Sequence, residues 1–391
     1  MQSGVVPGAA VDVRINGKVV GSGAYGWAQV VPVHVPMTTT SVFDLASLTK
    51  PLATATIALA LCERGVLSLD EPIHWLLPQL KLLGGAGATV RTLLSHSGGV
   101  PGWRPLYAYG RDRESVIASL AKLSPAYEAG SRWEYSCVGY VIVGLAIEER
   151  AASPLDGLFD ELVRDASGAR IIGYPSKLGD VPYVSTEVHN YYEEAMLDRA
   201  GVLFSGWRQV CQPGQVNDGN AWYALGGVSG NAGLFGTASD VGAVGQAWLD
   251  SVGDGSQLLS GPAARLAASV QASWRGVDRG LGWELHSGRR PERDGSAVPI
   301  SSQAFFPVAN WGESFQPRSS GELLGPGAFG HTGFTGTSLW IDPGARLVAT
   351  LLTNATHPRV PTDDRSLRSL RARFHNVLAL ASSRGSDGLP P

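Results

Sequence analysis

Cysteines are few in this sequence, and none of them lies where a structural bridge or a metal site would need it. The three cysteines, Cys62, Cys137 and Cys211, are an odd number and form no CxxC pair. This excludes a disulfide framework and a thiolate zinc site, and it favours a reducing compartment. None of the eight histidines lies three or four residues from another, so no helical pair of metal ligands exists either.

Charge is also scarce, and neither sign dominates. Charged residues make up 17% of the chain, and 31 basic residues against 34 acidic ones leave a net charge of -3. This balance provides no basic stripe for a phosphate backbone and no polybasic anchor for anionic lipid. No uncharged apolar run reaches the roughly 20 residues that span a bilayer, and no basic segment followed by an apolar core opens the chain. We therefore expect neither a nucleic acid nor a membrane as a partner, and a cytoplasmic location.

Several enzyme motifs are missing as well. The chain contains no GxSxG elbow, HExxH pair, GxxxxGK loop or EF-hand loop. We therefore expect no metal and no cofactor. What the chain has in excess is glycine, 50 residues without a three-residue period, which excludes collagen. A hydrophobic share of 44% excludes disorder, and 391 residues fit two domains or one large elaborated fold.

Strand patterns occur near both ends of the chain, and helical patterns lie between them. Residues 9–26 alternate around Asn16-Gly17, which indicates a hairpin, and strand patterns return at 279–286, 337–342 and 346–353. The terminal segments should therefore share one antiparallel sheet, with a helical insertion and a cleft between the two parts. Helices are predicted at residues 46–64, 89–95, 113–123, 136–150, 155–165, 239–251 and 363–381.

These patterns predict an α/β (α+β) fold with two regions. Residues 1–36 and 261–381 would form the region with the sheet, residues 37–260 the mainly helical region, and residues 382–391 a disordered tail. Residues 166–236 have poor periodicity, so no helix or strand is predicted there.

The first candidate for chemistry is Ser47-Leu48-Thr49-Lys50, at the start of the first predicted helix. The three-residue spacing puts the serine hydroxyl and the lysine amine on one helix face, within reach of each other. Serine needs an adjacent base to take its proton, and burial is a standard way to lower the pKa of a lysine for that role. On spacing alone, however, an N-capping Ser47 with a solvated Lys50 is the more common arrangement.

Two further segments could join this pair. Tyr135 precedes an apolar helix and could relay a proton, its pKa lowered by a neighbouring cation. Residues 330–336, Gly-His-Thr-Gly-Phe-Thr-Gly, lead into a strand, and glycines there let backbone N–H groups approach a substrate as an oxyanion hole requires. Taken alone, each segment has a structural explanation: an aromatic packed at a helix start, a β-bulge, and a hydrogen-bonded His331.

Together these segments resemble the serine β-lactamase and penicillin-binding protein superfamily, in its branch of class C β-lactamases and family VIII carboxylesterases. Residues 43–50 resemble the nucleophile segment of that superfamily, Tyr135-Ser136 its Tyr-x-Asn motif, and His331-Thr332-Gly333 its Lys-Thr-Gly or His-x-Gly motif. The resemblance implies a β-lactamase/transpeptidase-like fold, in which terminal helices flank the antiparallel sheet and a second region is mainly helical. Further matching segments follow in the same order at residues 65–72, 92–99 and 225–235.

The resemblance also implies a mechanism. Ser47 would attack an acyl carbonyl, Lys50 and Tyr135 would share the role of base, and water would release the acyl-enzyme. The backbone N–H groups of Ser47 and Phe334 would form the oxyanion hole, with Gly333 beside it. Which of Lys50 and Tyr135 acts as the base stays open, because coupled groups need not have separate answers.

Two residues depart from the family pattern. Cys137 stands where the family has an asparagine, and a thiol is a weak hydrogen-bond partner for a β-lactam amide. His331 replaces a lysine, so the site lacks a fixed positive charge for a substrate carboxylate. Both changes favour neutral esters over penicillins. Aromatic residues in loop-rich stretches could line an apolar acyl pocket or equally belong to the core; they are Trp103, Tyr107, Tyr109, Trp207, Trp222, Tyr223 and Trp311.

We therefore predict a serine hydrolase that cleaves carboxylic esters through an acyl-enzyme on Ser47, with weak β-lactam hydrolysis. Its substrate would be a small-molecule ester or amide. A β-lactamase, a D-amino-acid peptidase or an acyltransferase is the alternative within the same chemistry. An inactive binding protein with the same fold is the alternative outside it. The sequence leaves the natural substrate and the oligomeric state open.

Overall fold

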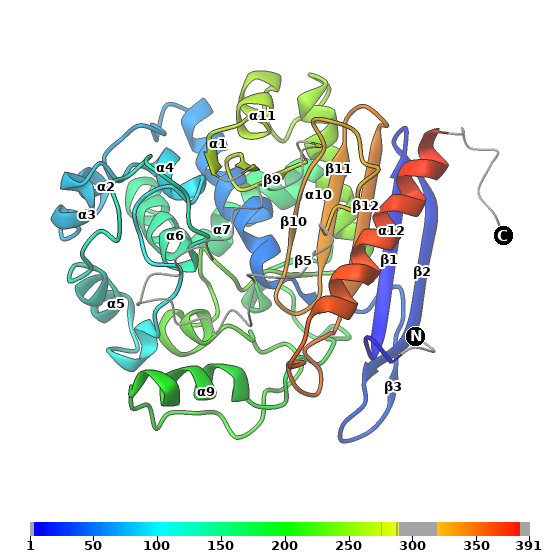
Figure 1. Cartoon of the computed structure of the whole chain (residues 1–391), viewed down its shortest axis with the longest axis horizontal. Coiled ribbons are helices and arrows are strands. Elements are labelled where there is room, and N and C mark those ends of the chain that lie inside the picture. Colours follow the sequence, from blue (N-terminus) through cyan, green and yellow to red (C-terminus); the bar gives the residue numbers. More distant parts are fainter. Residues whose placement is uncertain (1–3, 275, 287, 289–318, 384–391) are drawn as a thin grey trace.

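The computed structural model describes residues 4–274, 276–286, 288 and 319–383, and an antiparallel sheet runs through them (Figure 1). Within these residues the sheet has nine strands in the order β3-β2-β1-β12-β11-β10-β9-β8-β7. The first and the last strand of the chain, β1 and β12, are antiparallel neighbours in this sheet, as predicted. The strands are β1 Gly8–Ile15, β2 Lys18–Gln29, β3 Val35–Pro36, β7 Ala272–Trp274, β8 Val277–Arg279, β9 Glu284–Leu285, β10 Phe329–Thr332, β11 Ser338–Asp342 and β12 Leu347–Thr353.

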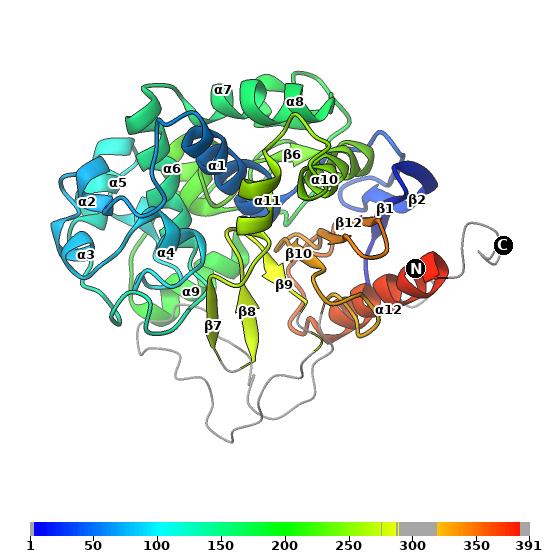
Figure 2. The same ribbon diagram turned by 90° about the horizontal axis from the view of Figure 1, so that it is seen from above.

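Two helices cover the two faces of the central strands (Figure 2). The helix α10 (Ala238–Val252) contacts β1, β11 and β12 from one face, and α12 (Arg365–Ser383) lies across the other. Because both faces are covered, every residue of β12 is buried. Gly245 of α10 lies so close to the sheet that a Cβ atom there would be 2.8 Å from the Val348 side chain. The predicted fold, an antiparallel sheet flanked by helices, is confirmed.

The chain between β3 and α10 is mainly helical and holds most of the buried apolar side chains. At its centre lies α6 (Cys137–Ala151), which is buried from its first residue to Ile147. The α-helices around it are α1 Thr56–Glu63, α2 Ile73–Leu76, α3 Lys81–Gly85, α4 Val90–Leu94, α5 Arg113–Leu120, α7 Leu155–Phe159, α8 Asp165–Ser167 and α9 Tyr191–Ala200, with α11 Gly261–Ala267 after α10.

Shorter elements complete the helical region. A small sheet has the strand order β4-β6-β5. Its strands are β4 Phe43–Asp44, β5 Ile172–Gly173 and β6 Phe235–Gly236. The 3-10 and π-helical segments are η1 Ala46–Leu48, η2 Lys50–Ala55, η3 Leu106–Ala108, η4 Asp160–Arg164, η5 Pro175–Lys177 and η6 Asn220–Ala224.

The structure differs from the predicted elements at several places, and residues 166–236, where no helix or strand was predicted, contain β5, η5, α9, η6 and β6. Residues 279–286 are not one strand, because the chain turns between β8 and β9 at Gly282, whose φ is 86°. The helix α9 was not predicted, because only Met196 and Leu197 of its residues are buried and no apolar period results. The helix α12 runs to Ser383, two residues into the predicted tail, while residues 384–391 lie outside the described residues. The proposed division at residues 36 and 261 stays a prediction.

Among the helices of the described ranges, none combines the length and the apolar character that crossing a bilayer would need.

Candidate active site

Ser47 and Lys50 lie in contact at the junction of β4 and the first helix. The turn between them and β4 is set by Asp44, whose carboxylate accepts the backbone N–H of Ala46 at 2.8 Å, and by the left-handed backbone of Ala46, φ 47°. Lys50 is fully buried, and its Nζ donates to Ser47 Oγ at 2.9 Å and to the carbonyl oxygen of Asn231 at 2.9 Å. The three-residue spacing therefore brings the hydroxyl and the amine together as expected, and the lysine is buried rather than solvated.

Tyr135 and Cys137 meet this pair from the start of α6. Tyr135 lies in the loop before the helix, 5.1 Å from its ring centroid to Lys50 Nζ, and its hydroxyl interacts with both Ser47 and Lys50. The helix begins at Cys137 because the Ser136 hydroxyl accepts the backbone N–H of Gly139 at 2.9 Å, an N-cap. The cap places Cys137 in the first turn, buried beside Lys50.

The protonation states of these groups differ from those expected. Burial raises the pKa of Tyr135 above its usual value, more than the nearby Lys50 charge lowers it. Burial lowers the pKa of Lys50, but Cys137, Tyr135 and Asp218 favour its charged form and together raise its pKa above the ordinary value. Both predicted effects are present, but other groups outweigh them, so the net pKa shifts of Lys50 and Tyr135 are opposite to those predicted.

The strand β10 adds His331 on another side of Tyr135, and the turn after this strand carries Gly333 and Phe334. His331 is buried, its ring centroid lies 5.9 Å from that of Tyr135, and its Nδ1 donates to the carbonyl oxygen of Thr332 at 2.7 Å. Burial, followed by the charges of Arg279 and Lys50, holds the pKa of His331 well below its usual range, so this imidazole is neutral.

Gly333 brings the end of β10 against the segment that carries Ser47. A Cβ atom on Gly333 would lie 2.5 Å from the carbonyl oxygen of Leu45, so only glycine allows this approach. The hydroxyl of Thr335 donates to the Asp44 carbonyl at 2.7 Å, and the hydroxyl of Thr337 donates to the Leu45 carbonyl at 3.1 Å. Phe334 itself is 41% exposed. The structure therefore brings all seven predicted site residues to one place.

Arg371 holds the turn after β10 from behind. This arginine lies on α12, and its Nη2 donates to the carbonyl oxygens of Gly333 at 3.0 Å and Thr337 at 2.9 Å. Burial lowers the pKa of Arg371 to about 10, which leaves it charged at neutral pH. The sequence predicted α12 as an amphipathic helix and missed this role.

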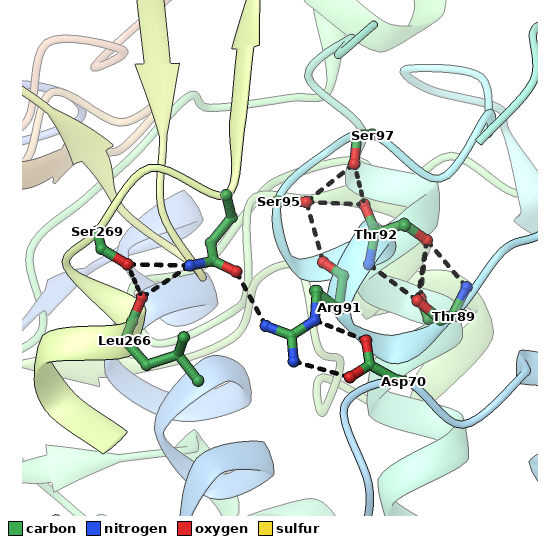
Figure 3. Close-up of polar contacts among 9 residues, drawn as sticks. Asp70, Thr89, Arg91, Thr92, Ser95, Ser97, Leu266 and Ser269 are labelled. Atoms are coloured by element: carbon green, nitrogen blue, oxygen red, sulfur yellow. Dashed lines mark hydrogen bonds and ion pairs between the residues drawn. The ribbon is translucent and has the colours of Figure 1, made fainter. Parts of the chain in front are cut away.

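His96, which the sequence analysis left without a role, packs on the Tyr135 ring. The two ring centroids are 4.6 Å apart, and His96 Nδ1 accepts the backbone N–H of Ser136 at 3.0 Å. Figure 3 shows how the surrounding turn is held: the hydroxyls of Ser95 and Ser97 hydrogen-bond to each other at 2.9 Å, and Ser95 also donates to the Arg91 carbonyl at 2.9 Å. Serines on both sides of His96 thus fix the backbone from which it reaches Tyr135.

Arg279 of β8 is a second cation that the sequence analysis missed. Its guanidinium carbon lies 4.7 Å from the ring centroid of Trp133 and 5.9 Å from that of Tyr135. Its ion pair with Glu284 is loose, at 3.6 Å. The strand pattern predicted at residues 279–286 begins with Arg279, and it gave no signal for a buried arginine at this place.

The predicted aromatic residues divide between a cluster, the core and the surface. Tyr107 packs on Phe204, Trp207 and Tyr223, with ring centroids 4.7, 5.9 and 5.3 Å away, and Trp103 lies 6.5 Å from Tyr107. Tyr107 and Trp103 are buried in the core. Tyr109 is 61% exposed, Trp222 lies under the Arg208 guanidinium, and Trp311 lies outside the described residues.

The family of this chain follows from its match to a family model. The model described as Beta-lactamase matches residues 1–372, nearly the whole chain. The chain belongs to the Beta-lactamase family. The predicted resemblance to β-lactamases and penicillin-binding proteins is thereby confirmed.

Individual relatives of this Beta-lactamase family member carry several names. The N-acetylmuramyl-L-alanine amidase of Bacillus subtilis (strain 168) is 28% identical over 380 residues, which cover 90% of this chain and 78% of the relative. A protein of Escherichia coli (strain K12) named putative D-alanyl-D-alanine carboxypeptidase is 28% identical over 344 residues, which cover 83% of this chain and 72% of that protein. Among solved structures, EstCE1, described as a hydrolase with promiscuous acyltransferase activity, has a TM-score of 0.66 at 20% identity and covers 95% of each chain. That likeness shows the shared fold.

Proposed function

We propose that this member of the Beta-lactamase family is a serine hydrolase that cleaves carboxylic esters through an acyl-enzyme on Ser47. The observation that carries the proposal is the 2.9 Å contact between Ser47 Oγ and the buried amine of Lys50. Serine is a weak nucleophile unless a neighbouring group accepts its proton. Ser47 is half-buried and touches both the Lys50 amine and the Tyr135 hydroxyl, so two groups that can carry its proton are in place.

In the proposed reaction, Ser47 Oγ attacks the ester carbonyl carbon and its proton passes to the coupled Lys50 and Tyr135 pair. The backbone N–H groups of Ser47 and Phe334 stabilise the negative charge that develops on the carbonyl oxygen. Tyr135 then protonates the leaving alcohol as the bond from the carbonyl carbon to the alkoxy oxygen breaks. Water attacks the resulting acyl-enzyme, and the acid leaves with Ser47 restored.

A preference for neutral esters is supported by two side chains. The Cys137 thiol is a weak partner for a substrate amide. His331 is neutral, because burial keeps its pKa low, so it offers no fixed charge to a carboxylate. Cleavage of amide bonds is the second candidate, and the names of the two relatives, an amidase and a putative carboxypeptidase, favour it.

The proposal is tested with a fluorophosphonate and a chromogenic short-chain ester. We expect mass spectrometry to find one adduct, on Ser47, and we expect ester turnover in the wild type. Ser47→Ala should form no adduct and should lose turnover by about 10³-fold or more. Ser383→Ala, which changes an exposed serine at the end of α12, is the matched control and should behave as wild type.

Two outcomes would decide against the ester hydrolase. Full turnover by Ser47→Ala would remove Ser47 from the reaction. Absence of any adduct and any turnover in the wild type would favour the inactive binding protein. Comparison of ester and cephalosporin chromogens separates an esterase from a β-lactamase, and an added acceptor alcohol reveals acyl transfer.

A further inference from the structure

A loop on the far side of Lys50 from Ser47 sets where the lysine amine can lie. The backbone carbonyl of Asn231 accepts from Lys50 Nζ at 2.9 Å. The preceding carbonyl, of Gly230, accepts from the Thr54 hydroxyl at 2.7 Å. Gly230 also packs directly on Gly144 of α6, where a Cβ atom on Gly230 would lie 3.0 Å from the Gly144 Cα. The acceptor of the lysine amine is therefore fixed by two neighbouring elements.

The side chain of Asn231 connects this loop to Asp218. Asn231 is fully buried, and its Oδ1 accepts from the Ser229 hydroxyl at 2.7 Å. Because that bond fixes the orientation of the amide, Nδ2 points the other way and donates to Asp218 Oδ2 at 3.0 Å. The other oxygen of Asp218 accepts the backbone N–H of Ala221 at 2.9 Å. Every polar atom of this link has a partner.

Asp218 also favours the charged form of Lys50, after Cys137 and Tyr135, and it is the carboxyl among these three groups. Burial raises the pKa of Asp218, but the Ala221 N–H, the Lys50 charge and the Asn231 amide stabilise its ionised form.

A second buried carboxyl, that of Glu193, lies next to Asp218 and is the neutral one of the two. Glu193 accepts the Tyr107 hydroxyl at 2.7 Å and the backbone N–H of Gly219 at 2.8 Å. Burial and the charge of Asp218 raise the pKa of Glu193 to about 8. Below that pH, Glu193 is therefore protonated, which removes its repulsion of the Asp218 carboxylate.

We propose that Asp218 is a positioning residue for Lys50 and that it acts through Asn231. It fixes the loop whose carbonyl holds the lysine amine against Ser47, and its carboxylate balances the charge of that amine. The proposal rests on the proposed function of Ser47 as the nucleophile, and it adds a residue that no motif of the sequence indicated.

The test compares Asp218→Asn with wild type in ester hydrolysis, with rates normalised to the sites that a fluorophosphonate titrates. We expect kcat to fall about tenfold to hundredfold, because the amine loses its fixed place, with KM within about twofold. We also expect the limb of the pH profile governed by Lys50 to move to lower pH, because the protonated amine loses its counter-charge. A fall in kcat without this movement, or a rise in KM with kcat unchanged, would overturn the proposal.

Two more variants guard against a folding defect and provide a control. Asn231→Ala keeps the carbonyl acceptor and the Asp218 charge, so kcat should fall while the pH profile keeps its position; a wild-type kcat would overturn the proposal even if Asp218→Asn does not fold. Glu193→Gln imitates the protonated side chain and should match wild type below pH 8. If the wild type forms no Ser47 adduct, the proposed function itself is wrong. If the adduct forms equally fast in wild type and in Asp218→Asn, only the positioning role of Asp218 is wrong.

Discussion

Two groups of side chains adjoin Tyr135, and they differ in whether their buried polar atoms have hydrogen-bond partners. In the Lys50 cluster (Lys50, Asp218 and Asn231), every polar side-chain atom has a hydrogen-bond partner. In the His331 cluster (His96, Arg279 and His331), buried Nε2 atoms of both histidines and the arginine Nε have no hydrogen-bond partner among the described residues. The charges differ in the same way. Asp218 favours the charged form of Lys50, whereas the ion pair that Arg279 forms within the described part of the chain, with Glu284, is loose at 3.6 Å.

The contrast indicates a division of labour across the site. A buried polar group left without a partner costs about 1–3 kcal/mol, so the His331 cluster carries a cost that the Lys50 cluster does not. A satisfied network holds one geometry and one protonation state, which suits proton transfer. The three unpartnered atoms of the His331 cluster are themselves buried, so this cluster lacks the fixed hydrogen-bonded arrangement of the other. We therefore interpret the Lys50 cluster as the chemical side of the site.

The largest expected effect comes from comparing two buried arginines. Arg371→Met should lower the free energy of unfolding by about 4 kcal/mol, because it removes two buried charge-assisted hydrogen bonds to the Gly333 and Thr337 carbonyls, which keep only their backbone donors. Arg279→Met should change it by less than about 1 kcal/mol, because a weakly paired charge is replaced by an apolar chain of similar length. Urea unfolding of both variants measures the difference. Equal losses of unfolding free energy in the two variants would contradict this expectation, because they would show that the contacts of Arg279 stabilise the fold as much as those of Arg371.

The next largest effect is a dependence of stability on pH, and it arises at Glu187, which holds the residue that packs on Phe334. The Phe334 ring packs on Tyr192 at 5.3 Å between centroids, and the buried Glu187 accepts the Tyr192 N–H at 2.9 Å. Burial raises the pKa of Glu187 from 4.5 to about 7. The folded state therefore binds this proton more tightly, and the resulting stabilisation is complete below about pH 4.5 and lost as pH rises to 7.

Glu187→Gln should remove this dependence on pH. At pH 8 the variant should exceed wild type in free energy of unfolding by up to about 3 kcal/mol, and at pH 4.5 the difference should be small. Urea unfolding at the two pH values measures it. If the variant and wild type differ in free energy of unfolding by the same amount at both pH values, Glu187 does not titrate in this range.

The smallest expected effect comes from placing an amide beside Lys50. Cys137→Asn should raise the ratio of cephalosporin to ester turnover about tenfold, the value of one hydrogen bond between the new amide and the β-lactam. The ratio is independent of how much protein is folded. Cys62→Ser, which lies outside the site, should leave the ratio unchanged. An unchanged ratio in Cys137→Asn would show that the thiol is not what disfavours β-lactams.

Local chemistry in the sequence predicted one part of the site and could not predict another. Ser47 and Lys50 are three positions apart, so a helix alone brings them together, and β1 and β12 follow from strand patterns at the two ends. Asn231 and Asp218 could not be found in the same way, because Asn231 lies 181 positions from Lys50 and only the folded chain makes the contact. The one available signal was that residues 225–235 match a family segment.

The errors about protonation have a related cause. Burial of Lys50 was foreseen, and burial alone lowers the pKa of a lysine. The opposing groups come from segments far apart in the chain: Tyr135 and Cys137 at the start of α6, and Asp218 before η6. The pKa of Lys50 depends on all of its neighbours, so a prediction made from one helix included only some of them.

Among the elements of the described residues, α12 is the last to be synthesised, yet its Arg371 holds the turn that carries Gly333. The strand β1 pairs early with β2 but lacks its second partner until β12 has been made, and Gly8 bonds to Asn354, 346 positions away. Contacts across such distances close long loops and form late in folding. A ribosome-bound chain can therefore bring Ser47 and Lys50 together while β10 is still without its support. The nascent chain would carry its proposed nucleophile early and acquire activity only when its last helix docks.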